Sequence, residues 1–276
     1  MTRMTTIVLS ALLGGCLAGA VFWWQGKSAR ESASQPPATL AAGASSPAPV
    51  AAAPSAPSIR HPIQPASVAV SGAAPGFDST LLDLFGHEAV AGLFRTDDFA
   101  HRFVATVDNL GRNAAPASVW PMNPAAGRFL TSNAAAGEVI QPDNGLRYVP
   151  YVLLLEQVDL RRVVQAYELH YDALQHAYEE LGFPQGYFND RFVDVLDLLI
   201  ATPEATPPVH VHRPVIEGVQ PARPWLMYEF DDPTLRSLTA GQRLLLRMGP
   251  VDERRVKKRL AELRGLLLAG TQGATR

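Results

Sequence analysis

Two histidines with one residue between them, His210 and His212, are the best placed pair in this 276-residue chain to bind a metal ion. The residues around them alternate between apolar and polar, which predicts a strand with both imidazoles on one face. A shared zinc ion would need a third ligand, such as His170, His176 or a carboxylate. Pro214 follows closely, and two histidines beside a proline are more typical of a solvated strand edge. We therefore expect no metal and no other cofactor, and name His210 and His212 as the ligands that a metal would use.

Carboxylates are the second group that could do chemistry. Five of them could supply the pair that cleavage of a glycosidic bond requires: Glu179, Glu180, Asp190, Asp194 and Asp197. The three aspartates lie opposite the apolar face of a predicted helix, where water solvates them. A general acid needs burial or a like charge beside it to titrate near neutrality. The sequence therefore favours a non-catalytic protein and assigns no catalytic residue.

The amino-acid composition further narrows the classes of protein to which this chain can belong. The chain has 24 basic and 26 acidic side chains; four of the basic ones and one acidic one precede residue 77, which leaves 20 and 25 after it. An acidic domain without a basic run argues against nucleic acid as a partner. Cys16 is the single cysteine, so a disulfide within the chain is impossible and the folded part must hold together by packing.

The first residues have the composition of a membrane anchor. Residues 7–24 contain no charged side chain and end in three aromatic residues, as at a membrane interface: Phe22, Trp23 and Trp24. Their length matches a spanning helix. We expect a short tail at residues 1–6, an uncleaved transmembrane helix at residues 7–24, and therefore the membrane as a partner.

Two other interpretations of this start remain open. Residues 13–16, LGGC, resemble a lipobox, in which case Cys16 would become the lipidated first residue. Residues 18–20, AGA, resemble the cleavage site of a signal peptide. In both cases an apolar stretch would remain after the cut, which favours the anchor.

The short leading tail and the Pro-rich segment that follows favour an inner-membrane protein with its N-terminus inside and its C-terminal domain in the periplasm. Ala11, Gly15 and Gly19 lie four residues apart, a spacing that lets two spanning helices approach closely. Such residues are common in any spanning helix, so a homodimer is an open alternative.

Residues 25–76 have the composition of a linker. They hold nine prolines, many alanines and almost no charge. Proline removes a backbone donor and fixes φ, so neither a helix nor a sheet can propagate. Too little apolar area is available to offset the entropy of ordering. We expect a disordered spacer, with a reach of roughly 40 Å as a random coil.

Residues 77–269 carry apolar residues at helical spacing over most of their length, and residues 270–276 read as a flexible tail. Helix-capping residues and helix-breaking residues such as glycine and proline predict where each helix begins and ends. In the first half of this range we expect a helix capped by Asp78 or Ser79 and ending at Leu84, a helix at residues 88–93, and a helix capped by Thr96 and ended by Gly111. Next we expect a helix from Leu160 to Leu181 and a helix capped by Asn189 that ends near Thr202. The last two expected helices are one capped by Thr239 and ending at Met248, and one through Val256 and Leu267.

Two short stretches predict β-hairpins. Residues 142–145, PDNG, form a turn signal between residues 138–140 and 146–148. Residues 209–230 contain alternating apolar residues at both ends and predict a second hairpin. The expected fold is mainly α: a single transmembrane helix, a disordered Pro/Ala linker, and a compact helical domain with minor β-hairpins.

From Phe99 to the last helix the chain resembles the bacterial DUF3014 family, whose function is unknown. The matching blocks are residues 102–110, RFVATVDNL; residues 177–184, AYEELGFP, with 187–191, YFNDR; and residues 240–242, AGQ, with 244–250, LLLRMGP. Asp172 departs from the family pattern, in which a proline follows Tyr171. The resemblance implies the architecture, and it implies no substrate, cofactor or catalytic residue.

These observations favour a membrane-anchored envelope protein that acts as a non-catalytic interaction or scaffolding module on the periplasmic side. Its expected partner is another envelope protein or a component of the cell wall. The alternative is a hydrolase of an envelope polymer such as peptidoglycan, which would use the carboxylates or a metal at the two histidines.

Overall fold

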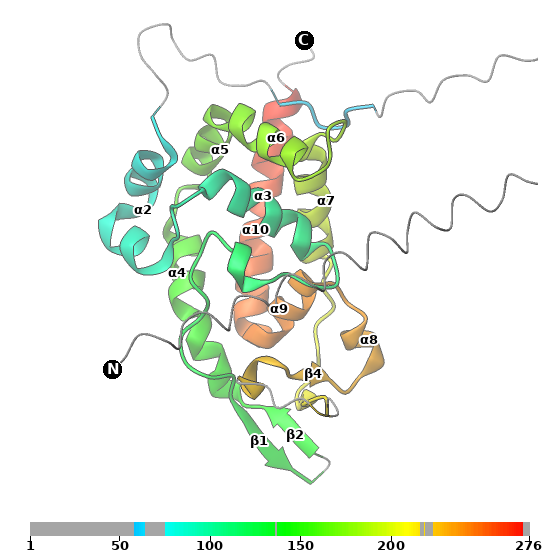
Figure 1. Cartoon of the computed structure of the whole chain (residues 1–276). Helices are drawn as coiled ribbons and strands as arrows, with labels where there is room; N and C mark the ends of the chain where they lie inside the picture. Colours follow the sequence, from blue (N-terminus) through cyan, green and yellow to red (C-terminus); the bar gives the residue numbers. More distant parts are fainter. Residues whose placement is uncertain (1–57, 64–74, 136, 216–217, 219–222, 273–276) are drawn as a thin grey trace, which may run out of the picture. The chain divides into compact units, whose positions relative to one another are not determined.

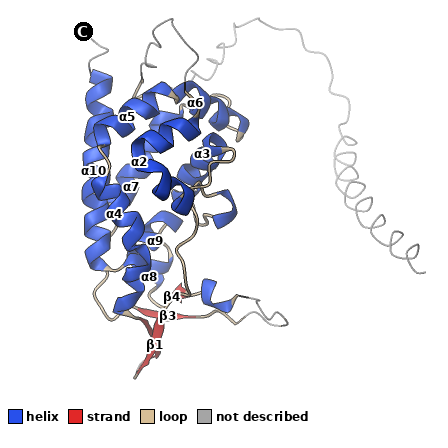
Figure 2. Cartoon of the chain, turned by 90° about the vertical axis from the view of Figure 1, so that its left-hand side faces the viewer, coloured by secondary structure: helices blue, strands red, loops and turns tan. Residues whose placement is uncertain are grey.

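The computed structural model describes residues 58–63 and 75–272, except residues 136, 216–217 and 219–222. The expected anchor at residues 7–24 and most of the expected linker lie outside the described residues. Within them, helices follow one another along most of the chain and strands are short (Figures 1 and 2). The α-helices are α2 (Phe77–Leu93), α3 (Phe99–Leu110), α4 (Val149–Gln157), α5 (Leu160–Leu169), α6 (Tyr171–Glu180), α7 (Phe188–Ile200), α8 (Pro233–Arg236), α9 (Ala240–Met248) and α10 (Pro250–Gln272).

The strands form one small antiparallel sheet at one end of the helical part (Figure 2). Its order is β1-β2-β3-β4, with β1 (Thr131–Ala134), β2 (Gly137–Ile140), β3 (His210–His212) and β4 (Glu229–Phe230). The predicted pairing across residues 209–230 is confirmed, because Val211 faces Phe230 in the register of β3 with β4. Val211 and Phe230 are buried with Tyr228 and Leu246 in a small cluster between the sheet and α9.

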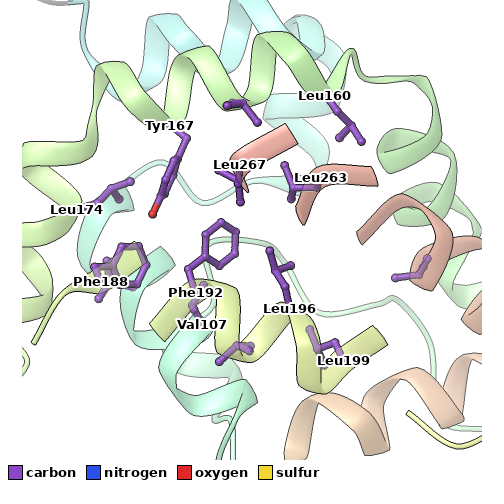
Figure 3. Close-up of a cluster of buried hydrophobic side chains, with 14 of the residues drawn as sticks. Val107, Leu160, Tyr167, Leu174, Phe188, Phe192, Leu196, Leu199, Leu263 and Leu267 are labelled. Carbon is purple, nitrogen blue, oxygen red and sulfur yellow. The ribbon is translucent and has the colours of Figure 1, made fainter. Parts of the chain in front are cut away.

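The main core lies between α10 and the helices packed around it. Apolar side chains from α3, α5, α6, α7 and α10 converge there, as Figure 3 shows. Phe188, Phe192 and Leu196 of α7 are buried, and so are Tyr167 of α5 and Leu267 of α10. Burial of each such side chain stabilises the fold by about 1.5–3 kcal/mol relative to leaving it in water.

Gly241 allows α9 to approach α3 and α7 closely. A Cβ atom at this position would lie 2.6 Å from Leu199 Cδ2 and 3.0 Å from the carbonyl oxygen of Leu110. The AGQ block therefore allows α9 to pack closely against its neighbours. Thr239 caps α9 as predicted, with the reciprocal bonds of a capping box to Gln242.

The helix predicted from Leu160 to Leu181 is two helices, because the chain leaves helical geometry at His170 (φ −100°, ψ 8°). The His170 ring stacks on Phe77 at 4.2 Å, which ties the break to α2. Asp172 then lies in the first turn of α6. Proline is tolerated in a first turn and a carboxylate is favoured by the helix dipole there, so the departure from the family pattern fits this new helix start.

Two other local predictions are wrong. Residues 142–148 form a short 3-10 helix instead of a turn, and the hairpin is β1 with β2, upstream of it. Thr96 does not cap α3: the N-cap is Asp98, in the left-handed region (φ 55°) and without a side-chain capping bond. The carboxylate of Asp98 instead contacts His101 at 2.5 Å.

α2 is bent where the sequence predicts two short helices. Gly86 has φ 78° and ψ 162° within it, a conformation open essentially to glycine alone. Among the described residues, no helix has the length and apolar content that crossing a bilayer requires.

Candidate functional site

One polar site among the described residues holds a segment of the chain itself. Residues 58–63, SIRHPI, lie beside the start of α7 (blue in Figure 1), although they fall in the range expected to be linker. Asp190 accepts two backbone hydrogen bonds from them: Arg60 N–H reaches Oδ2 at 2.9 Å and His61 N–H reaches Oδ1 at 2.7 Å. One carboxylate thus binds two successive amides.

Two further α7 contacts hold the backbone of the same segment. Asn189 donates from Nδ2 to the carbonyl oxygen of His61 at 2.8 Å, and Ile63 N–H donates to the hydroxyl oxygen of Tyr187 at 2.7 Å. Peptide groups of three residues, Arg60, His61 and Ile63, are therefore bonded directly.

Two side chains of the segment add contacts that depend on sequence. Arg60 donates from Nη2 to Asp194 Oδ2 at 2.7 Å, and Ile63 packs against the main core. Asp190 also lies 4.0 Å from Arg60 Nε. We call the four residues Tyr187, Asn189, Asp190 and Asp194 the α7 clamp.

Core hydrogen bonds orient the α7 clamp. Asn189 is fully buried; its Oδ1 accepts from the Tyr167 hydroxyl at 3.1 Å, which leaves Nδ2 to face the segment. Its backbone N–H donates to the Tyr171 hydroxyl at 3.1 Å. Gln175 Oε1 accepts from Phe188 N–H at 2.8 Å. Burial raises the pKa of the Tyr167 hydroxyl well above its ordinary value, so it remains a donor at physiological pH.

A partly buried ion pair next to the α7 clamp fixes α7 against α3. Arg191 donates from Nε to Asp108 Oδ1 at 2.9 Å and from Nη2 to the Asp108 carbonyl oxygen at 2.9 Å. Arg112 bonds the other carboxylate oxygen at 2.7 Å. Blocks 102–110 and 187–191, which are far apart in the sequence, meet at this pair.

The structure changes the roles that the sequence suggests for two clamp residues. Asn189 was expected to cap α7, but the N-cap is Tyr187 and the Asn189 side chain bonds the core and the segment. Asp190 was expected to be solvated, but residues 60–61 cover it and its side chain is 13% exposed. The expectation for Asp190 fails because the helical wheel takes no account of a distant segment on the polar face. The expectation for Asn189 fails because Tyr167 and the same segment bind its side chain.

Each of the other candidate carboxylates bonds or pairs with different side chains. Glu179 accepts from Gln175, Asp197 pairs with Arg264, and Glu180 lies between His101 at 2.6 Å and His176 at 3.2 Å. The hydrogen bond from His101 lowers the pKa of Glu180, the opposite of what a general acid needs. Glu179, Glu180 and Asp197 therefore each have a hydrogen-bond or ion-pair partner of their own.

The two histidines named for metal binding do lie in one strand, β3. His212 Nδ1 contacts Asp231 Oδ1 at 2.5 Å, whereas the buried Nδ1 of His210 has no hydrogen-bond partner among the described residues. The proposed third ligands are engaged elsewhere: His170 with Thr80 at 2.8 Å and His176 with Glu180. Over the described part of the chain, no three His, Cys, Asp or Glu side chains gather as a metal site would need.

Sequence reasoning missed the segment at residues 58–63 and two buried carboxylates, Asp252 and Glu253. Proline at position 62 and the small residues around the segment made it look like the rest of the linker. No local pattern predicts the burial of Glu253, which is 1% exposed in the first turn of α10. Burial raises its pKa, and Lys257 lies 3.5 Å away.

Fold and site together define a mainly helical domain with a small antiparallel sheet, whose α7 holds an extended peptide segment. Residues 99–264 match the family described as "Protein of unknown function (DUF3014)", so the chain belongs to this family, as its resemblance indicated. No match was found among curated proteins or among solved structures. The α7 clamp lies inside the matched region, whereas residues 58–63 and α2 lie outside it.

Proposed function

We propose that this chain is a non-catalytic interaction module of the bacterial envelope, whose folded part binds extended peptide segments at the α7 clamp. One observation carries the proposal: a buried side chain of the domain, Asn189, gives its free donor to the backbone of a segment outside the family-matched region. The occupant in the structure is the chain's own residues 58–63.

Peptide chemistry supports this function. Bonds to backbone groups provide affinity for any extended chain, and side-chain contacts at intervals provide specificity. The α7 clamp has both kinds, since it bonds three peptide groups of the segment and also its Arg60 and Ile63 side chains. A suitable partner is an envelope protein with an exposed extended segment that has arginine at the first bonded position and an aliphatic residue three positions later.

The second part of the proposal is the location. The uncharged run at residues 7–24 supports a single-pass anchor in the inner membrane, with the folded part on the periplasmic side. Membrane fractionation tests it: the full chain should remain with the membrane after a salt wash, and a Cys16→Ser variant should remain there too. Loss of attachment in Cys16→Ser would favour the lipoprotein, and a soluble mature chain without its first residues would contradict any anchor.

A peptide titration tests the binding function. A fluorescent peptide with the sequence of residues 58–63 is added to a full chain in which the same residues are replaced by glycine and serine, so that the α7 clamp is open. We expect saturable binding in the micromolar to millimolar range, because a short flexible peptide loses much entropy on ordering. Binding should fall at least tenfold in Asp190→Ala, which removes two bonds to the peptide backbone.

Asp172→Ala is the matched control, because this exposed aspartate of α6 lies outside the α7 clamp. Equal binding to the Asp190→Ala and Asp172→Ala proteins, or no saturable binding at all, would overturn the proposal. The hydrolase alternative has its own test: turnover of cell-wall fragments that is lost in His210→Ala or Asp190→Ala.

A further inference from the structure

A second site lies under α2 and is lined by none of the residues of the α7 clamp, although Tyr167 of its wall bonds Asn189. It is a cavity of about 260 Å³ between α2 and the helices α3, α5 and α10. Phenylalanine dominates its wall, at positions 77, 85, 94, 99, 103 and 192. Tyr167, Phe192 and Leu267, which Figure 3 shows in the core, form its inner side.

The wall offers no group for a charged ligand. No Asp, Glu, Lys or Arg side chain lines this cavity in the described part of the chain. Its polar side chains already have partners: Thr80 Oγ1 and His170 Nε2 bond each other at 2.8 Å, and the Tyr167 hydroxyl donates to Asn189. A ligand with a charge inside this space would lose its hydration without compensation.

The space is partly open to solvent, which distinguishes it from an enclosed packing defect. Its wall is almost entirely apolar, so water gains little there. An engineered apolar cavity of about 150 Å³ binds benzene. The present cavity is larger and accommodates an apolar group bigger than one benzene ring.

α2 is the outer wall of the cavity, and mainly apolar contacts join its first half to the rest of the fold. It lies outside the family-matched region and bends at Gly86. Few polar contacts join its first half to the other helices, namely the Thr80–His170 bond and an exposed pair in which Arg162 donates to Asp83 at 2.6 Å. A lid of this kind can open for an apolar ligand and close over it.

We propose that the cavity under α2 is a binding site for an uncharged apolar molecule, such as one medium-length acyl chain or a fused aromatic ring system. The ligand replaces the missing packing between α2 and the core, so that binding orders the lid. This inference is independent of the peptide function of the α7 clamp.

The test is a titration of the full chain in mild detergent with the uncharged dye N-phenyl-naphthylamine, whose fluorescence rises in apolar surroundings. Ala166→Phe places a ring in the cavity from α5. Ala173→Phe places the same ring at an exposed position of α6, and the partition of the dye into detergent is the same for both variants. We expect saturable binding by the wild type and by Ala173→Phe, weakened at least tenfold in Ala166→Phe.

Two further measurements guard against a folding artefact. Circular dichroism establishes that each variant is folded, and Leu84→Trp fills the cavity from the lid side if Ala166→Phe does not fold. Hydrogen exchange of α2 should slow in the wild type when the dye is added. Equal binding by the folded, filled variant and Ala173→Phe, or no saturable signal in the wild type, would overturn the inference.

Discussion

The amide of Asn189 is the residue at which the core and the bound segment meet. We expect Asn189→Leu to lower the free energy of unfolding by about 1–3 kcal/mol, because the Tyr167 hydroxyl and the His61 carbonyl both lose their partner. Urea unfolding of the full chain measures this. Asn133→Leu, at an exposed position of β1, is the control and should change stability little. A similar small change in both variants would show that the Asn189 bonds do not stabilise the fold.

His101 gives the chain a pH-dependent contribution to stability. Hydrogen bonds to Glu180 and Asp98 raise its pKa above 6.5, and the same contact lowers the pKa of Glu180 below 4.5. The histidine contribution is complete below 6.5 and is lost as pH rises through its raised pKa; the Glu180 contribution is complete above 4.5 and is lost as pH falls through its lowered pKa.

The His101–Glu180 contact therefore stabilises most between pH 4.5 and 6.5. We expect His101→Gln to be less stable than the wild type in that window by a small amount, since both side chains are half exposed. The difference should vanish near pH 9, about two units or more above the ordinary pKa of a histidine. Urea unfolding at both pH values measures it, and a difference that persists unchanged at the higher pH would contradict this assignment.

Residue roles were harder to predict than residue positions. The pattern placed Asp194 and Asp197 on the polar face of α7, and both are substantially exposed there. It could not show that Asp190 and Asn189 bind a segment more than a hundred residues away, because the hydrogen bonds that redefine them come from outside the helix. Asp98 differs, because its side chain contacts His101 of the same helix, α3, instead of capping it.

At the scale of elements, the bend in α2 depends on one glycine. We expect Gly86→Ala to lower the free energy of unfolding by about 1–3 kcal/mol, since the residue has φ 78° and ψ 162°. Gly92→Ala in the same helix is the control: its φ is ordinary and nothing lies near the added methyl group, so alanine should be neutral or stabilising. Urea unfolding compares them, and equal effects would mean that the bend carries no conformational requirement.

Sequence patterns located most elements and failed where tertiary contacts decide the limits. The Thr239 cap, the end of α3 at Gly111 and the pairing of β3 with β4 follow local rules and are confirmed. The division between α5 and α6 does not follow local rules, because the apolar stripe continues through His170. Only the contacts of His170 with α2 show the break. The turn signal at residues 142–145 likewise became a 3-10 helix.

At the scale of the whole chain, the linker and the domain are not independent. Residues 58–63 belong by composition to the linker and by contacts to the domain. In our proposal, this docking leaves the α7 clamp occupied until a competing segment replaces the chain's own. The cavity under α2 adds a second site of different chemistry on the same scaffold.

Hydrogen exchange at the bound segment tests the central claim, which is that the α7 clamp holds residues 58–63. In the full chain, the amides of Arg60, His61 and Ile63 should exchange far more slowly than those of an unstructured peptide, because each donates to a clamp residue. Asp190→Ala should release the first two while the amides of the α7 core stay protected. Exchange of these amides at the unstructured rate in the wild-type chain would contradict the account.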